Sequence, residues 1–209
     1  WGTALARAAC RAKCTTKLYA REPEIVDAIN AGDGNPVFLP DIPLGRDIHA
    51  TADLSEAVNG ADALLLVVPA QFMRGVAEAL ADITPDHVPV VLVAKGIEQG
   101  TLALMSEIIE ETMPRHTLAA ISGPSFASEV ARGLPVALTL ACKDKTLGAK
   151  LVSALASPMF RIYQSDDVIG AEIGGAVKNV LAIACGIVEG RGLGDNARAA
   201  LITRGLAEM

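Results

Sequence analysis

The chain has 209 residues, a formal net charge of −6, 51% hydrophobic residues and only 3% aromatic ones. Because acidic side chains outnumber basic ones and no basic stripe stands out, this composition argues against a nucleic-acid partner, although a few local cations could still bind a small anion. No apolar run reaches the roughly 18 residues that a membrane span needs, so the composition predicts a soluble protein with an aliphatic core.

Short apolar runs typical of strands alternate with helical patterns along most of the chain. The run Ala63–Val68 is apolar without alternation, as expected for a central strand that is covered on both faces. The alternation predicts an α/β fold with a Rossmann-like, mostly parallel sheet and helices on both faces. The expected strands are Lys17–Ala20, Ala63–Val68, Val88–Ala94, Leu118–Ile121, Val136–Ala141 and, as an addition, Phe160–Tyr163, and the expected helices cover residues 3–13, 22–31, 71–82, 101–113, 125–132 and 144–156.

The first residues fit the end of a glycine-rich nucleotide loop. Gly2 could be the third glycine of a GxGxxG pattern, which lets a helix and a strand pack closely. Arg21 follows about 20 residues later, at the end of the next expected strand, where a dinucleotide fold binds the adenosine ribose. An arginine suits a 2′-phosphate and the adjacent Glu22 a 2′-hydroxyl, so the pattern favours NADP over NAD. The alternative is that Glu22-Pro23 merely begins a helix.

The pattern changes after Asp167. From about Val168 to Met209 there is no strand pattern, and two helical stretches are separated by residues 189–194. We therefore predict a dinucleotide-binding domain over residues 1–166 and the beginning of an all-α substrate or catalytic domain over residues 167–209. Because the first strand and the start of the glycine-rich loop would precede Trp1, we interpret the chain as a fragment.

Two lysines are candidates for the chemistry. Lys95 follows a buried strand, at the edge where ligands bind in open α/β sheets, and a solvated lysine in a turn is the equal alternative. Lys178 lies in the glycine-led apolar stretch Ile173–Val180, which resembles the first turns of a helix. It is either a surface lysine or an acid/base, because apolar neighbours would lower its pKa as a catalytic amine requires.

The segment after the strand Leu118–Ile121 predicts an anion site. Gly123 ends the strand, Pro124 is expected at the first turn of a helix, and Ser125 follows with free backbone amides. Ordinary capping by Ser122 or Ser125 is compatible with this interpretation.

The cysteines favour no metal site. Cys10 and Cys14 lack the CxxC spacing and have no histidine near them, so we expect no zinc and a reducing, cytoplasmic location.

Five motifs in order resemble the NAD(P)-dependent glycerol-3-phosphate dehydrogenase family in its bacterial form. They are residues 1–6 (WGTALA), Val91–Gly96, Ile121–Glu129 (ISGPSFASE), Gly174–Asn179 (GGAVKN) and Asp195–Gly205. Related hydroxyacid and 6-phosphogluconate dehydrogenases typically carry an asparagine four residues after the lysine, where this chain has Ala182.

The resemblance implies hydride exchange between NADP or NAD and C2 of sn-glycerol 3-phosphate, giving dihydroxyacetone phosphate for glycerophospholipid synthesis. By this analogy Lys178 is the proton acceptor, and its charge would be disfavoured by Lys95. The substrate-binding residues would be Lys95, Gly123, Ser125 and Asn179, and the cofactor-binding residues Trp1, Arg21, Lys95 and Ala127. Because the later region with further substrate contacts is missing, we expect the fragment itself to have little or no activity.

Three alternatives remain open. One is another hydroxyacid dehydrogenase of the 6-phosphogluconate-dehydrogenase-like group, with a pocket for a carboxylate. A second is a non-catalytic nucleotide-binding module, which would keep the Arg21 and Ser125 regions and tolerate loss of Lys178. The third is an interaction protein without catalytic activity, in which the apolar helix Val177–Val188 forms a homodimer. We expect instead that this helix packs between the domains.

Overall fold

The strands form two separate sheets in the computed structural model, which describes residues 1–208. In the smaller sheet β1 (Thr16–Tyr19) and β2 (Ile48–Thr51) are parallel. The larger sheet has the order β3-β4-β5-β6-β7, and among its described pairs only β5 and β6 are antiparallel. Its strands are β3 (Leu64–Leu66), β4 (Val90–Leu92), β5 (Leu118–Ser122), β6 (Val136–Cys142) and β7 (Phe160–Ser165). The predicted mostly parallel α/β architecture is confirmed.

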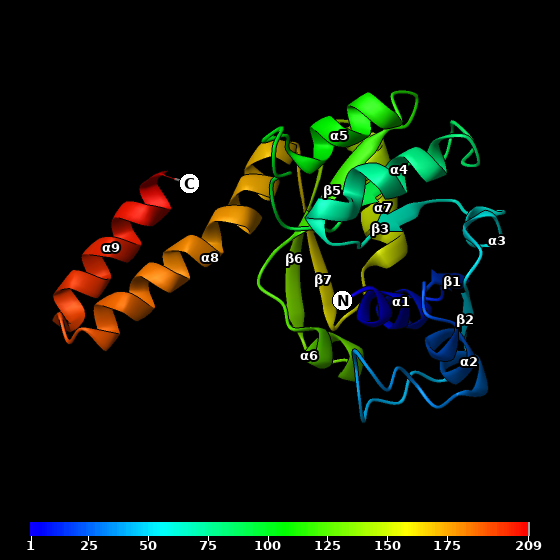
Figure 1. Cartoon of the computed structure of the whole chain (residues 1–209), viewed down its shortest axis with the longest axis horizontal. Helices are drawn as coiled ribbons and strands as arrows, with labels where there is room; N and C mark the ends of the chain where they lie inside the picture. The colour runs from blue at the N-terminus through cyan, green and yellow to red at the C-terminus, as the bar shows by residue number, and fades with distance from the viewer. Residues whose placement is uncertain (209) are drawn as a thin grey trace.

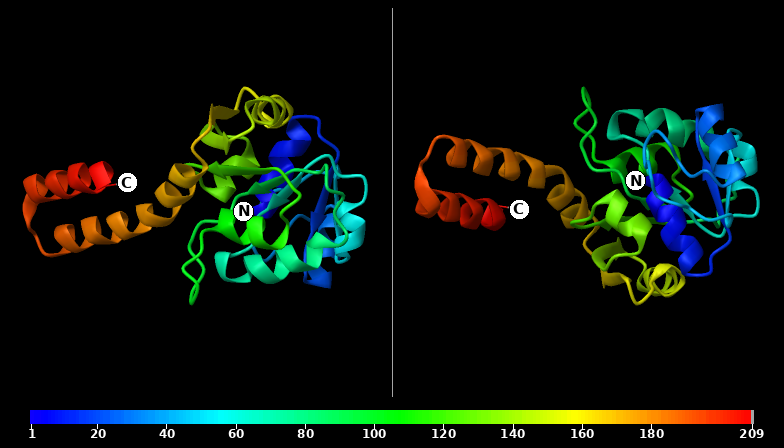
Figure 2. Two further views of the ribbon diagram at one scale, coloured as in Figure 1. Left: turned by 90° about the horizontal axis from the view of Figure 1, so that it is seen from above. Right: turned by 90° about the horizontal axis from the view of Figure 1, so that it is seen from below.

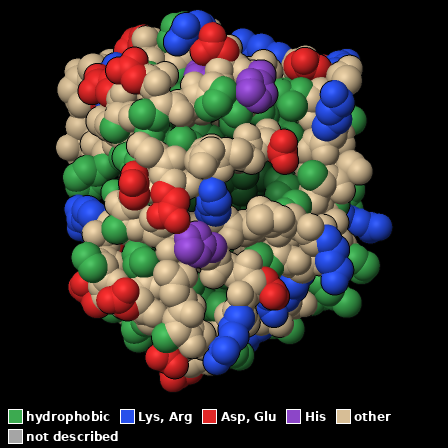
Figure 3. Space-filling view, turned by 90° about the vertical axis from the view of Figure 1, so that its right-hand side faces the viewer, with side chains coloured by type: hydrophobic (Ala, Val, Ile, Leu, Met, Phe, Trp, Pro, Cys, Tyr) green, Lys and Arg blue, Asp and Glu red, His purple; other side chains and the backbone are tan. Residues whose placement is uncertain are grey.

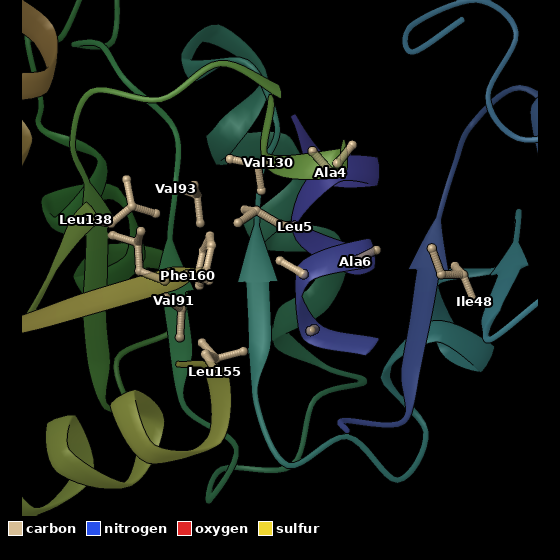
Figure 4. Packing of buried hydrophobic residues seen from close by; sticks show 14 of the residues in the cluster. Ala4, Leu5, Ala6, Ile48, Val91, Val93, Val130, Leu138, Leu155 and Phe160 are labelled. Carbon is tan, nitrogen blue, oxygen red and sulfur yellow. The ribbon is translucent and has the colours of Figure 1, made fainter. Parts of the chain in front are cut away.

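Helices cover both faces of the larger sheet because alternate residues of a strand point to opposite sides. Val91 of β4 and Val93, which follows this strand, pack in one cluster with side chains of α1 (Gly2–Arg11), α6 (Ala127–Arg132) and α7 (Lys145–Leu155), as Figure 4 shows. Val90 and Leu92 of the same strand pack in a second cluster with α4 (Met73–Ala81) and α5 (Met105–Thr112). The remaining elements of this part are α2 (Pro23–Ala31), α3 (Leu54–Val58) and the 3-10 helix η1 (Ala70–Phe72).

Two helices project from the α/β body as a hairpin (Figures 1 and 2). The first, α8 (Val168–Gly190), begins against β5 and β6 and then leaves the sheet, and α9 (Gly194–Glu208) returns along it. The predicted pair of helical stretches is confirmed. Outside the sheet, Val180, Ile183 and Ile187 of α8 form an exposed apolar stripe, in which each side chain is at least 57% exposed.

The apolar character of α8 corrects one expectation from the sequence. Its 23 residues, with a mean hydropathy of 1.5 in the best window, meet the length and composition of a membrane span, although no continuous apolar run had suggested one. Length and composition alone are weak evidence, since core helices of soluble proteins meet the same criterion. The first half of α8 is part of the protein core, because Val168, Glu172 and Gly175 are buried.

Two short elements, β2 and α3, were not predicted. In β2 Ile48 and Ala50 are buried and His49 is exposed, an alternation too short to stand out from a loop. The strands β3 and β4 are shorter than the apolar runs that contain them, because the ends of these runs leave the sheet toward the loops. The reversed direction of β6 had no counterpart in the local pattern, since alternation does not report strand direction.

Charged side chains are dispersed over the face of the molecule drawn in Figure 3. Basic groups are more frequent along its right and lower right, and acidic groups along its left.

Candidate active site

Two glycines bring the loops after β4 and β5 into close contact with their neighbours. Gly96 has φ +147°, and a Cβ there would lie 2.8 Å from Ala70 Cβ. Gly123 has φ +151°, and a Cβ there would lie 2.8 Å from Leu138 Cδ2 and 3.3 Å from the carbonyl oxygen of Ala137. Since both φ values suit glycine and both spaces are filled, larger residues would displace the loops that carry the candidate site.

Lys95 directly precedes Gly96 in the chain and contacts Gly123. Its Nζ donates a hydrogen bond to the carbonyl oxygen of Gly123 at 3.0 Å, which joins the ends of neighbouring strands. Partial burial lowers the pKa of Lys95, and the positive charge of Lys178 lowers it further. The two amines are therefore close enough to influence each other, as expected from the sequence.

Lys178 is positioned by α8. The helix begins after Asp167, whose carboxylate accepts from the backbone N–H of Gly170 at 2.8 Å. Lys178 thus lies in the middle of a long helix, and the prediction that it lies in the first turns was wrong. Gly174 and Gly175 do not begin the helix. Gly175 instead lets it approach the sheet, because a Cβ there would lie 3.0 Å from Ser122 Oγ and 3.4 Å from Lys95 Cγ.

An open cleft of about 490 Å³ lies between α8 and the ends of β4 and β5. Both candidate lysines line it, and Lys178 is exposed because the cleft is open to solvent. Ser125 and Asn179 are not among its lining residues. The lining residues are Lys95, Ser122, Gly123, Pro124, Thr139, Ser165, Asp167, Gly170, Ala171, Gly174, Gly175 and Lys178.

The predicted anion site at the start of α6 is corrected by the structure. The helix begins at Ala127, and Phe126 is its N-cap residue with an extended backbone, φ −109° and ψ 130°. Pro124 and Ser125 therefore precede the helix, and the latter does not offer first-turn amides. The extended Phe126 explains the shift, because a residue with this backbone cannot be part of a helical turn.

Two of the predicted cofactor residues, Trp1 and Ala127, lie at α1 and at the neighbouring helix α6. Trp1 is the N-cap residue of α1 and is partly buried against the core, as is Ala127 of α6. A Cβ on Gly2 would lie 3.7 Å from Val67 Cβ and 3.9 Å from Leu18 Cδ1. The expected close approach of helix and strands is present, but these are ordinary contact distances.

Arg21 lies just beyond β1 and points away from the core. Its side chain is 80% exposed and forms an ion pair with the adjacent Glu22 at 3.1 Å. Glu22 is the N-cap residue of α2 and Pro23 the first helical residue, so the alternative that this pair begins a helix is also correct.

Several polar side chains of the cleft were missed by sequence reasoning. Ser122 pairs directly with Thr139, and Ser165 pairs with Ala141, so these polar groups share the face of the sheet that α8 covers. The end of an expected strand could have indicated Ser122. The others depend on the register of β6 and β7, for which the sequence holds no local signal.

No group of three or more His, Cys, Asp or Glu side chains within residues 1–208 could hold a metal ion.

Taken together, the mostly parallel sheet, its flanking helices and the cleft beyond its strand ends define a Rossmann-like α/β protein followed by a helical region. The family model of the NAD-dependent glycerol-3-phosphate dehydrogenase N-terminus matches residues 1–148, and the model of the C-terminus of the same family matches residues 167–209. The chain belongs to the NAD-dependent glycerol-3-phosphate dehydrogenase family.

Individual relatives agree with this assignment. The chain is 58% identical over its whole length to glycerol-3-phosphate dehydrogenase [NAD(P)+] of Rhodospirillum rubrum, of which it spans 60%. It is 60% identical over its whole length to the protein of that name from Paramagnetospirillum magneticum, of which it spans 76%. The crystal structure of glycerol-3-phosphate dehydrogenase from Coxiella burnetii matches the whole chain with a TM-score of 0.90 and 38% identity, over 64% of that protein.

Proposed function

We propose that this chain supplies cofactor-binding and catalytic residues of an enzyme that interconverts sn-glycerol 3-phosphate and dihydroxyacetone phosphate with NADP or NAD. The observation that carries the proposal is that Lys95 and Lys178 line one cleft beyond the ends of parallel strands. Membership of the glycerol-3-phosphate dehydrogenase family supports this choice of substrate.

The amino-terminal end of α1 fits a dinucleotide. This 10-residue helix has no acidic residue in its first turn and no side-chain cap, so its first backbone N–H groups are available to a pyrophosphate. The exposed guanidinium of Arg21 suits a ribose 2′-phosphate and favours NADP over NAD. We assign cofactor contacts to Trp1, Arg21, Lys95 and Ala127.

Lys178 is the proton acceptor in this proposal. When the alcohol is oxidised, the proton of the C2 hydroxyl passes to Nζ of Lys178 as the carbonyl forms, and in the reverse direction Lys178 returns it. A bound nicotinamide supplies the redox chemistry by accepting the hydride from C2.

The substrate is an anion, and two cationic side chains line its proposed site. The pKa of Lys95 is lowered chiefly by burial and further by the charge of Lys178, and a bound phosphate dianion would offset the repulsion between the two side chains. We assign substrate contacts to Lys95, Gly123, Ser125 and Asn179. The first two line the cleft, whereas Ser125 and Asn179 are supported by their positions next to lining residues.

We propose a dinucleotide-binding domain over residues 1–166 and a helical domain from residue 167, in agreement with the start of α8 at Val168. Four free cysteines suit a cytoplasmic enzyme that provides glycerol phosphate for lipid synthesis. The exposed stripe of Val180, Ile183 and Ile187 could support a homodimer, which sedimentation of the chain and an Ile183→Glu variant would test.

The decisive experiment measures NADPH binding and substrate reduction separately. Since the chain spans 60% of the Rhodospirillum rubrum relative, turnover is measured on that relative with residues 1–209 of this chain in place of the matching segment, and binding also on the chain itself. We expect NADPH binding in both, and turnover with dihydroxyacetone phosphate but not with small keto acids. Turnover confined to keto acids would favour a hydroxyacid dehydrogenase, and binding without any turnover would favour a non-catalytic module.

A further inference from the structure

The side chain of Lys178 is exposed and forms no hydrogen bond with the residues that the structure describes. Its position depends on the helix that carries it. One carboxylate of that helix is nearly enclosed: Glu172, with 7% of its surface exposed, lies on the side of α8 that faces α5.

We propose that Glu172 is a positioning residue, whose hydrogen bonds to Ser106 fix the rotation of α8 and thereby hold Lys178 beside Lys95. This inference rests on the proposed function for its catalytic meaning, but the geometry that it describes can be measured without turnover.

The contact joins two elements that are far apart in the sequence. The carboxylate of Glu172 accepts from the backbone N–H of Ser106 at 2.9 Å and from its hydroxyl at 2.5 Å. Ser106 lies in the first turn of α5, where backbone N–H groups have no acceptor within the helix. The carboxylate thus satisfies a free amide and lies at the positive end of the helix dipole. Burial nevertheless raises the pKa of Glu172, because enclosing the group disfavours its charged form.

A second contact lies one turn further along α8. Gly175 packs where a Cβ would be 3.0 Å from Ser122 Oγ and 3.4 Å from Lys95 Cγ, so the helix cannot move closer to the sheet here. Residues three apart on a helix are neighbours on its surface. Glu172, Gly175 and Lys178 therefore follow one another along successive turns. The first anchors the helix to α5, the second sets its distance from Lys95, and the third reaches the cleft.

Glu172 acts through the helix rather than on a ligand. It does not line the large cleft, and it borders only a small cavity of about 10 Å³ that it shares with Lys95, Ser122 and Gly175. That volume is comparable to the space for one water molecule and is too small for a triose phosphate.

The test measures the chemical reactivity of the two lysine amines. Trace acetylation with acetic anhydride over a range of pH, followed by peptide mass spectrometry, gives the pKa and reactivity of Lys95 and Lys178 in the folded 209-residue chain. In Glu172→Ala we expect Lys178 to move away, so that the pKa of Lys95 rises and its labelling rate at neutral pH falls, because less of the amine is unprotonated. Glu172→Gln keeps an oxygen acceptor for the Ser106 amide and should label like the wild type.

Three further variants separate positioning from a loss of stability. Glu110→Ala removes an exposed carboxylate of α5 that is not among the charges acting on Glu172, and should leave Lys95 labelling unchanged. Lys178→Ala should reproduce the change at Lys95, and Glu172→Ala added to it should have no further effect. If Glu172→Ala does not fold, Ser106→Ala, which keeps the backbone donor, should shift Lys95 in the same direction by a smaller amount.

Unchanged Lys95 labelling in a folded Glu172→Ala or Ser106→Ala variant overturns the inference, as does a Glu172→Gln variant that behaves like alanine. The proposed function fails in a different way, by absence of turnover in the wild-type chimera while the labelling pattern is as expected. In an active chimera, Glu172→Ala should lower kcat with little change in the KM for NADPH.

Discussion

Lys95 donates from Nζ to the carbonyl oxygen of Gly123 at 3.0 Å, so the ends of β4 and β5 are joined by a side chain that also lines the cleft. The contact holds the amine at the edge of the sheet, toward α8. An anion that entered the cleft would meet a cation already placed there, with less side-chain entropy left to lose on binding.

Replacement of Lys178 by alanine should abolish turnover in the chimera while NADPH binding is mostly kept. General acid–base groups contribute about 10²- to 10⁴-fold to rate, and we expect a loss in kcat of this order. Lys150→Ala, which removes an exposed lysine of α7, is the matched control and should be neutral. Turnover within a few-fold of the wild type would rule out the proton-acceptor role.

Gly123→Ala should destabilise the chain through two separate effects. The residue would be strained at φ +151°, and its Cβ would lie 2.8 Å from Leu138 Cδ2. Gly60→Ala is the comparison for a positive φ without crowding, because Gly60 has φ +71° and nothing within 4 Å of the added carbon. We expect the loss in free energy of unfolding, measured by urea denaturation, to be about 1–3 kcal/mol for Gly60→Ala and larger for Gly123→Ala. Equal losses would mean that the loop can move away from Leu138.

The contribution of Lys95 to the free energy of unfolding should change as the pH is raised from neutral to alkaline values. Its pKa in the folded protein is lowered from the ordinary 10.5, chiefly by burial. Below this lowered pKa, Lys95 is protonated in both the folded and the unfolded protein. The partly buried charge then destabilises the folded state in full. As pH rises through that value toward 10.5 the folded state releases its proton first, so stability rises relative to a variant without the group.

Urea denaturation of the wild type and Lys95→Met at pH 7 and pH 10 measures this effect. The difference in free energy of unfolding should shift in favour of the wild type at the higher pH, by a small amount because the amine is partly exposed. A shift of the opposite sign would contradict the lowered pKa.

The loop that follows Lys95 should be sensitive to acid through Glu98. Arg74 donates to both oxygens of this carboxylate, at 3.0 Å from Nε and 2.8 Å from Nη2, and its guanidinium holds the pKa of Glu98 below the ordinary 4.5. This contribution is present above pH 4.5 and is lost as pH falls through the lowered pKa. Arg74→Met should therefore destabilise the chain at pH 7, and the difference from the wild type should shrink on acidification below pH 4. Arg115→Met, which removes an exposed ion pair with Asp86, is the control with a smaller effect.

Local patterns predicted much of the architecture. The apolar runs at Ala63–Val68 and Val88–Ala94 located β3 and β4, and the texture change near Asp167 located the start of α8. These signals survive because a buried parallel strand must be apolar on both faces and a helix must keep its own hydrogen bonds. The start of α6 after Phe126 was not predicted, because a single residue with an extended backbone does not change the hydrophobic pattern of the sequence.

The sequence by itself determined the α/β class, the family resemblance and the residue types that could do the chemistry, among them Lys95 and Lys178. Only the tertiary structure decided that these two amines line the same cleft, that Thr139 and Ser165 face α8, and that Glu172 meets Ser106. The physical reason is the distance along the sequence between the residues that interact. Strand and helix patterns arise from neighbours along the chain, whereas a cleft depends on strand direction, register and the rotation of a helix. Those are set by contacts such as that of Gly175 with Lys95, between residues that are far apart in the sequence.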